Sequence, residues 1–146
     1  MAGIGSANTK PEMIIRTGLH ALGRRYRLHV KGLPGKPDLV FPKHRAVIFV
    51  QGCFWHGHDC SLFRWPATRP DFWRNKIAGN IARDARVRTG LIDAGWRVLD
   101  VWECTLKGKT RQPVVDVLAQ CVGFLDGDGR QASIGSGQAV TVEDCA

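Results

Sequence analysis

The feature that most constrains the fold is the junction between an apolar strand and a loop dense in metal-binding side chains. Residues 46–50 (AVIFV) are continuously apolar and mostly β-branched, as expected for a strand that is covered on both faces of a sheet. The residues that follow at 52–60 (GCFWHGHDC) hold two thiols, two imidazoles and two large aromatic rings. The sequence therefore places most of its chemistry at the exit of a central strand.

The other segments alternate between helical and strand patterns. Thr9-Lys10-Pro11-Glu12 has the form of a capping box with proline in the first turn, and it predicts a helix that ends near Gly23. Residues 71–94 carry apolar side chains at helical spacing and end before a glycine, so they predict a long helix. The remaining predicted elements are strands at 26–30, 38–41 and 96–102 and a closing helix at 113–124.

This order of elements predicts a three-layer α/β domain with a mixed sheet. The 146 residues, of which 44% are hydrophobic, suffice for the core of one domain but not of two. Residues 1–125 are therefore predicted to form a single domain. From residue 126 onward Gly, Ser, Asp and Gln dominate, which predicts a flexible C-terminal tail over 126–146.

The chain is strongly basic. Lys and Arg outnumber Asp and Glu by 21 to 13, which gives a net charge of +8 and a pI of about 9.7. Nucleic acid is the first partner to consider for such a chain, although an inert basic surface explains the charge equally well. No apolar run is long enough for a membrane span and no secretory signal is visible, so a cytoplasmic protein is expected.

Four potential metal ligands follow two neighbouring predicted strands. Cys53, His58 and Cys60 lie in one loop, and Cys104 comes at the end of the last predicted strand. An odd count of five cysteines without a secretory signal argues against a disulfide framework. Cys and His are ligands of tetrahedral Zn²⁺, and a site with four of them is closed and structural. The alternative is that Cys53 and Cys104 are simply buried while His58 is exposed.

A series of short motifs runs from about Thr9 to Gly108, some two thirds of the chain. The motifs are LPGKPD at 33–38, VIFVQGCFWH at 47–56, Cys60, FW at 72–73, Asn80, RD at 83–84, GWRV at 95–98 and VWEC at 101–104. Pro37-Asp38 and the end of the neighbouring strand resemble the metal-binding hairpin of the PD-(D/E)XK nucleases. The whole series resembles the very short patch repair (Vsr) endonuclease family, for which GCFWH and WEC are highly specific.

The resemblance implies both a fold and an activity. A member of that family would nick one strand of duplex DNA beside a T:G mismatch, the product of 5-methylcytosine deamination, to start very short patch repair. The implied fold is the restriction-endonuclease-like α/β core of the PD-(D/E)XK type. The resemblance further implies action as a monomer, mismatch-repair proteins as additional partners, and a place in the bacterial cytoplasm, on the nucleoid when DNA is bound.

The resemblance also implies roles for individual residues. Asp38 would hold catalytic Mg²⁺ with its carboxylate, and Val50 would add its backbone carbonyl. His56 would be the general base, because an imidazole that titrates near neutrality can take a proton from water. Glu12 and Asp84 match the polar surround of the family's site, with a helix cap or a salt bridge as their alternative roles.

The aromatic and basic residues around the loop would contact DNA. Phe54, Trp55 and Trp73 correspond to the rings that the family inserts into the base stack beside the mismatch, where unstacking is easier than in paired DNA. The alternative is that these rings belong to the core. The side chains expected to grip phosphates are Arg64, Arg69, Arg74, Lys76 and Arg83.

Two features depart from the family pattern. Gln51 stands where the best-known members carry His and others carry Asp, and because an amide cannot take a proton, catalysis would rely more on His56. Only residues 1–8 precede the capping box, which predicts weaker DNA binding than in relatives with a longer basic segment. Two other functions stay open: a zinc-stabilised mismatch-binding module without catalysis, and a zinc hydrolase, which four closed ligands disfavour.

Overall fold

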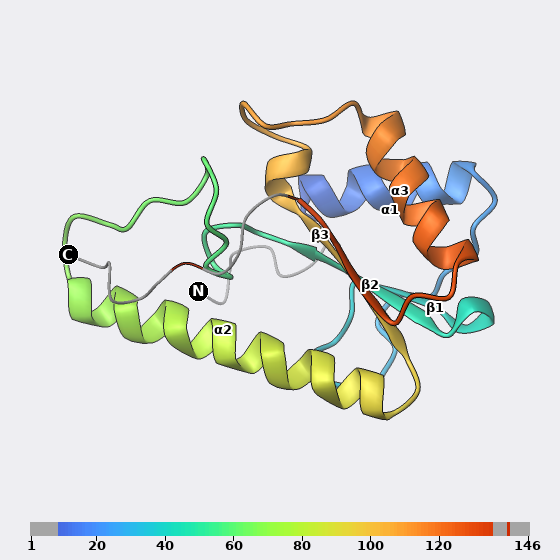
Figure 1. The fold of residues 1–146 in the computed structure, drawn as a ribbon, viewed down its shortest axis with the longest axis horizontal. Coiled ribbons are helices and arrows are strands. Elements are labelled where there is room, and N and C mark those ends of the chain that lie inside the picture. Colours follow the sequence, from blue (N-terminus) through green and yellow to red (C-terminus); the bar gives the residue numbers. More distant parts are fainter. Residues whose placement is uncertain (1–8, 136–139, 141–146) are drawn as a thin grey trace.

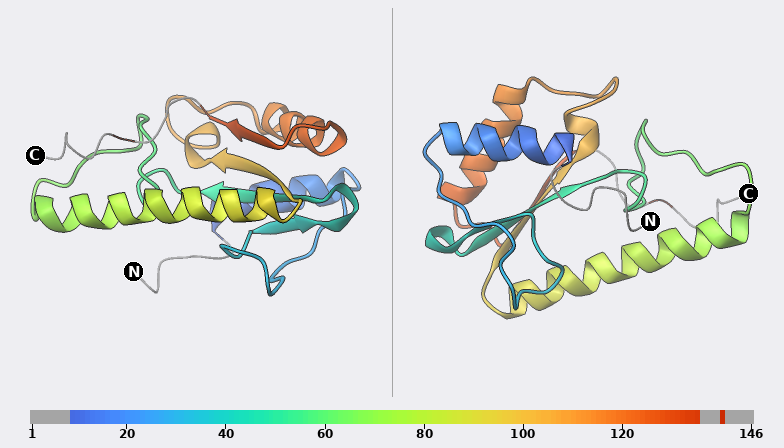
Figure 2. Two further views of the ribbon diagram at one scale, coloured as in Figure 1. Left: turned by 60° about the horizontal axis from the view of Figure 1, so that its bottom comes forward. Right: turned by 180° about the vertical axis from the view of Figure 1, so that it is seen from behind.

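The computed structural model describes residues 9–135 and residue 140, and these form three layers (Figure 1). Two helices, α1 (Lys10–Ala21) and α3 (Val114–Asp126), cover one face of a four-stranded sheet. The long helix α2 (Pro70–Asp93) runs across the other face (Figure 2). The strands are β1 (Leu39–Phe41), β2 (Ala46–Gln51), β3 (Arg97–Trp102) and β4 (Gln131–Ile134), and short 3-10 turns follow at Pro42–His44 and Glu103–Thr105.

The sheet is mixed, with the strand order β1-β2-β3-β4. β1 and β2 form an antiparallel hairpin with Leu39 opposite Ile48, whereas β3 runs parallel to both β2 and β4. Gln51 lies opposite Trp102 at the ends of β2 and β3, so the chain leaves both strands at the same edge of the sheet. The loop after β2 and the turn after β3 therefore begin next to each other.

Each face of the sheet has its own apolar cluster. Ile48 and Leu99 pack towards α1 and α3, while Val47 and Val98 pack towards Leu91 of α2. Neighbouring side chains of a strand point to opposite faces, so a strand that is buried on both faces is expected to be mostly apolar. This explains the continuous run at 46–50 and confirms that it forms a central strand.

The helices agree with their predicted bounds to within two residues. The side chain of Thr9 caps α1 by accepting a hydrogen bond from the backbone N–H of Glu12 at 3.3 Å, as the capping-box motif predicts. α2 ends where Gly95 adopts a left-handed conformation with φ of 93°. Within the described residues, no helix combines the length and apolarity that crossing a bilayer requires.

Two segments differ from the prediction. Residues 26–30 form only an isolated bridge between Arg27 and Val40, because His29 adopts a left-handed conformation that a regular strand does not contain. The ordered strand β4 replaces the first part of the predicted tail. β4 is a polar edge strand in which only Ile134 is buried, so its sequence gives little hydrophobic signal. Residues 1–8, 136–139 and 141–146 lie outside the described residues, and the predictions for them stay predictions.

Candidate active site

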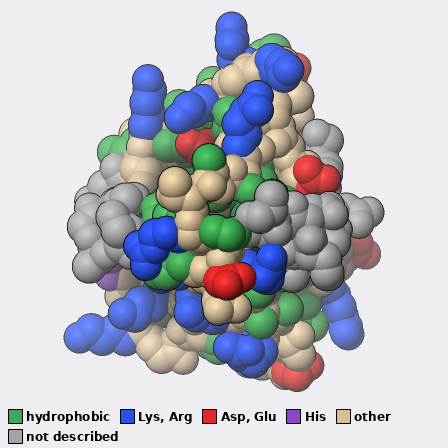
Figure 3. All heavy atoms as spheres, turned by 90° about the vertical axis from the view of Figure 1, so that its left-hand side faces the viewer, with side chains coloured by type: hydrophobic (Ala, Val, Ile, Leu, Met, Phe, Trp, Pro, Cys, Tyr) green, Lys and Arg blue, Asp and Glu red, His purple; other side chains and the backbone are tan. Residues whose placement is uncertain are grey.

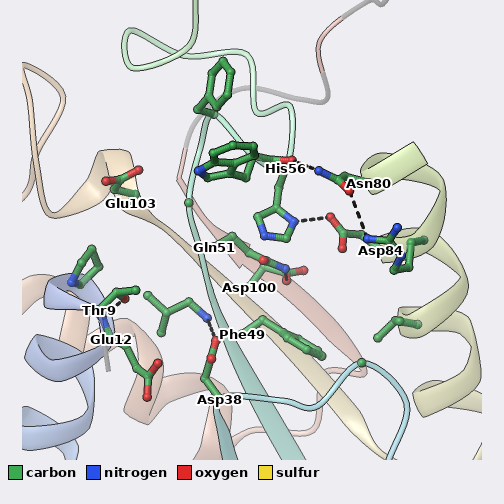
Figure 4. Close-up of a pocket in the computed structure, with 18 of the residues that line it drawn as sticks. Thr9, Glu12, Asp38, Phe49, Gln51, His56, Asn80, Asp84, Asp100 and Glu103 are labelled. Atoms are coloured by element: carbon green, nitrogen blue, oxygen red, sulfur yellow. Dashed lines mark hydrogen bonds and ion pairs between the residues drawn. The ribbon is translucent and has the colours of Figure 1, made fainter. Parts of the chain in front are cut away.

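A pocket of about 710 Å³ opens at the edge of the sheet where β2 and β3 end (Figure 4). Its walls come from the start of α1, the residues before β1, the loop after β2, the middle of α2 and the end of β3. The five residues predicted to take part in catalysis all line this pocket: Glu12, Asp38, Gln51, His56 and Asp84. Residues up to 72 positions apart in the sequence therefore share one site (from Glu12 to Asp84).

Asp38 is held at the floor of the pocket by the β1-β2 hairpin. Its carboxylate accepts a hydrogen bond from the backbone N–H of Val50 at 2.7 Å. The pKa of Asp38 is raised to about 7. Burial of the carboxyl group is the main cause, and the negative charge of nearby Glu12 contributes to the rise. Glu12 itself is only 5% exposed. Two carboxyl groups crowded together in a buried place favour a proton or a cation between them.

His56 and Asp84 form a pair on the opposite wall. The Nδ1 atom of His56 lies 2.6 Å from the carboxylate of Asp84. The carboxylate accepts a hydrogen bond from Nδ1–H of the neutral imidazole, so the lone pair of Nε2 is available to accept a proton. The loop is also fixed from α2, because Asn80 donates a hydrogen bond to the backbone carbonyl of Trp55 at 2.7 Å. Asn80 and Asp84 are four residues apart in α2 and so lie on one face of the helix.

Gln51 belongs to a buried polar network that no sequence motif predicted. Its side-chain N–H donates to the carboxylate of Asp100 at 2.9 Å, and Arg88 donates to the second oxygen of that carboxylate at 2.6 Å. Arg88 of α2 thus faces the sheet. Asp100 carried a signal of its own, because it is a charged residue inside the otherwise apolar run Val98–Trp102.

The four predicted zinc ligands meet beside the pocket. The ligand atoms of Cys53, His58, Cys60 and Cys104 all lie within 4.8 Å of one another. Nδ1 of His58 is 3.5 Å from the sulfur of Cys53 and 3.6 Å from that of Cys104. The ring of Trp102 stacks on the imidazole of His58 with centroids 4.1 Å apart. His58 is only 2% exposed, so the alternative of an exposed imidazole is wrong.

This cluster suits Zn²⁺ by its chemistry. Three thiols and one imidazole are the donor set of closed tetrahedral zinc sites. Burial raises the pKa values of the Cys53 and Cys104 thiols, so without a cation these sulfurs would keep their protons. The cluster joins the loop after β2 to the turn after β3, which places it where it can hold the wall of the pocket in shape.

The predicted DNA-inserting rings form one group at the mouth of the pocket. Phe54 contacts Trp55 and Trp73 with ring centroids 5.1 and 5.3 Å apart. All three rings are half-buried, and Phe54 and Trp55 line the pocket. The group continues through Phe63, which stacks on Phe54 with centroids 5.6 Å apart, to Trp65. Phe63 and Trp65 were not among the rings predicted to contact DNA.

The predicted phosphate-gripping residues lie in the same segments as these rings, the loop after β2 and the helix α2. Arg64, Arg69 and Arg83 are exposed, whereas Arg74 is half-buried and bonded to Asp71. Lys76 is half-buried, and it lines the pocket together with Arg83. Figure 3 shows Lys and Arg side chains spread around apolar ones on this face of the molecule. The face therefore combines positive charge and exposed apolar surface next to the pocket.

The known proteins that this chain resembles include a DNA mismatch endonuclease and type II nicking enzymes. The model of a family described as DNA mismatch endonuclease Vsr matches residues 1–62. The DNA mismatch endonuclease Vsr of Escherichia coli (strain K12) is 40% identical over 134 residues, which cover 92% of this chain and 86% of that protein. The type II nicking enzyme V.XorIIP of Xanthomonas oryzae pv. oryzae is 52% identical over 106 residues, which cover 73% and 78% of the two chains.

One solved structure extends the comparison to the fold. The catalytic domain of the homing endonuclease I-Bth0305I superposes with a TM-score of 0.52 and 19% sequence identity, over 81% of this chain and 94% of that domain. At this level of identity the likeness concerns the fold alone. It supports the α/β fold with a mixed sheet that the order of elements predicted, and the restriction-endonuclease-like core that the family resemblance implied.

Proposed function

The chain belongs to the Vsr family of DNA mismatch endonucleases, and on that premise we propose that it nicks one strand of duplex DNA beside a T:G mismatch. The observation that carries the proposal is the pocket in which Asp38 faces the His56–Asp84 pair, next to half-buried rings and basic side chains. The T:G pair left by deamination of 5-methylcytosine is the substrate implied by the family. We further propose that the protein acts as a monomer and passes the nick to repair proteins.

We infer that Mg²⁺ is the catalytic cation, held by the carboxylate of Asp38 and the backbone carbonyl of Val50. Oxygen ligands suit Mg²⁺, and a buried carboxylate beside Glu12 gains from a cation that offsets its charge. When bound, Mg²⁺ would neutralise charge that develops on the scissile phosphate. Glu12 would keep the surroundings of this site polar.

His56 would act as general base towards the attacking water. Its Nε2 atom would take a proton from water as the oxygen attacks the phosphorus, and the departing sugar oxygen would leave on the opposite side. Asp84 would stabilise the imidazolium that forms, because its carboxylate already accepts the hydrogen bond from Nδ1. The pair thus has the geometry of a base and the group that orients it.

Recognition would come from the rings and the cations around the pocket. Phe54, Trp55 and Trp73 would enter the base stack beside the mismatch, where a mispaired step is easier to open. The basic residues around them would hold the phosphates on either side. The Cys and His cluster would bind structural Zn²⁺ and keep the loop that carries Phe54, Trp55 and His56 in place.

A mismatch-binding module without catalysis is the second candidate. Such a module would use the same rings and cations, but it would have no need for a histidine–carboxylate pair opposite a buried aspartate. The test is a strand-specific nicking assay on a duplex with one T:G mismatch, with Mg²⁺ or EDTA, beside a T:A control and His56→Ala. We expect nicking only with the mismatch and Mg²⁺, and its loss in the variant. Binding of the mismatch without any nicking would support the module instead.

A further inference from the structure

One buried charged residue that lines the pocket, Asp100, has no role in the proposed reaction. Asp100 is only 3% exposed and sits in β3, between the apolar residues Leu99 and Val101. One carboxylate oxygen accepts from Gln51 at 2.9 Å and the other accepts from Arg88 at 2.6 Å. Gln51 is 6% exposed, and the side chain of Arg88 is 21% exposed. All three residues line the pocket.

The contact with Asp100 determines which end of the Gln51 amide faces the pocket. A carboxylate paired with a guanidinium accepts hydrogen bonds and donates none, so only the NH₂ end of the amide can point at it. The amide oxygen must then point away from Asp100. In Figure 4 Gln51 lies between His56, the proposed general base, and Asp38, the proposed ligand of Mg²⁺.

We propose that Arg88 and Asp100 are positioning residues, which hold the amide of Gln51 with its oxygen towards the pocket to accept a hydrogen bond from the attacking water. The proposal rests on the proposed function and adds these residues to it. Gln51 cannot take the proton, but its oxygen directs one water O–H towards itself and leaves the other for Nε2 of His56. Arg88 holds the carboxylate of Asp100 in place, and Asp100 prevents the amide from turning over.

The position of the ion pair supports a role in the site over a role in stability. Replacing a buried ion pair by apolar residues of similar size is often neutral or stabilising, so the fold alone gives no reason for this pair. Val98, two residues before Asp100 on the same face of β3, is fully buried among apolar side chains, which shows that this face of the strand accommodates an aliphatic side chain. What an apolar pair could not do is orient an amide at the edge of the pocket.

A mutant cycle tests the functional link. Gln51→Met keeps the shape but removes the hydrogen bond to water, and we expect kcat to fall roughly 10- to 100-fold. The paired replacement Arg88→Met with Asp100→Leu frees the amide to turn, and kcat should fall by a similar factor while the melting temperature stays equal or rises. The triple variant should be no slower than Gln51→Met alone, because the pair acts only through the amide. Losses that multiply, or wild-type kcat in Gln51→Met, would overturn the proposal.

The matched control is a second ion pair far from the pocket. Arg24 and Asp126 form a bidentate pair between the end of α1 and the end of α3. Arg24→Gln with Asp126→Asn removes this pair, and we expect kcat to stay within about twofold of wild type. A comparable loss of kcat in this control would show that removing any ion pair slows the enzyme, and the positioning role would be lost.

An NMR measurement tests the orientation without DNA, Mg²⁺ or turnover. We expect the side-chain NH₂ of Gln51 to show one proton shifted downfield and protected from exchange, because it is bonded to a carboxylate. The shift should disappear in the paired variant and, if that variant does not fold, it should decrease in the closely isosteric Asp100→Asn, because the hydrogen bond then loses its charged acceptor. An unchanged NH₂ signal would overturn the orientation. If the wild type nicks no duplex, the proposed function and the catalytic role of Gln51 fail together, while the NMR result still decides the orientation.

Discussion

Asp38 has a pKa of about 7 in the folded protein, raised mainly because its carboxyl group is buried. An aspartate in an unfolded chain has a pKa of about 3.9. The folded state therefore holds the proton more tightly than the unfolded state, and the free energy of unfolding falls as pH rises from about 4 to 7. Asp38→Asn removes the charge but keeps an oxygen for the N–H of Val50, so without Mg²⁺ we expect the variant to be about 2–4 kcal/mol more stable at pH 8.

Urea unfolding at pH 8 and pH 5, in magnesium-free buffer that retains zinc, measures this gain and its decline towards low pH. Asp126→Asn is the control with the opposite sign, because Arg24 lowers the pKa of this exposed carboxyl and its charge stabilises the fold above that pKa. The Asp38 variant should also lose nicking. An Asp38→Asn protein that is less stable than wild type at pH 8 would show that the buried charge of Asp38 does not destabilise the fold.

Single residues were predictable where a local motif carried them. His56 and Asp38 lie in recognisable motifs, and the pocket contains both, although their roles remain proposals. Asp100 and Arg88 had no such motif. Their contacts depend on the parallel register that sets Gln51 against Trp102, and on which face of α2 meets the sheet. Neither can be read from spacing along the chain.

At the scale of elements, burial on two faces and helix caps determine what could be foreseen. Residues 46–50 of β2 are all apolar because both faces of the strand are covered, and α1 starts at a capping threonine. β4 had neither signal, since it is a polar edge strand, and hydrogen bonds to β3 create it. Edge strands depend on a partner strand that is distant in sequence, so their own residues say little.

The predicted zinc cluster, formed by Cys53, His58, Cys60 and Cys104, connects the exits of β2 and β3. Cys104→Ser removes one of four ligands, so we expect a purified protein with less than one zinc per chain and a markedly lower melting temperature. Removing zinc from the wild type with a strong chelator should unfold the domain, because binding free energy at such sites is on the order of 10 kcal/mol. Metal analysis and circular dichroism before and after chelation measure both effects.

Cys121→Ala is the control for that experiment. Cys121 is a buried thiol of α3 that packs in the apolar core and not in the zinc cluster. Its replacement should lower stability modestly through lost packing but leave one zinc per chain. A wild-type protein that keeps its fold after complete removal of zinc would contradict a structural role for the cluster.

At the scale of the whole molecule, the net charge of +8 is expected to act through one face. Each cation that neutralises a phosphate releases counterions, so the logarithm of the binding constant falls with the logarithm of salt concentration. We expect Arg64→Ala, Arg69→Ala and Arg83→Ala each to reduce the magnitude of this slope by about 0.9. Each variant should weaken binding to T:G and T:A duplexes equally. Fluorescence anisotropy over a series of salt concentrations measures the slope.

Two control variants test whether the salt dependence comes from cations on this face, and not from the net charge or from ring insertion. Arg25→Ala removes an exposed cation after the end of α1, at the opposite end of that helix from the pocket, and it should leave the slope unchanged. Trp73→Ala should also keep the slope but reduce the preference for T:G over T:A, because insertion favours the step that opens more easily. If Arg25→Ala lowered the slope as much as Arg69→Ala, the whole surface would attract DNA without a defined path. Because both variants change the net charge equally, binding by a defined face requires Arg69→Ala to lower the slope and Arg25→Ala to leave it unchanged.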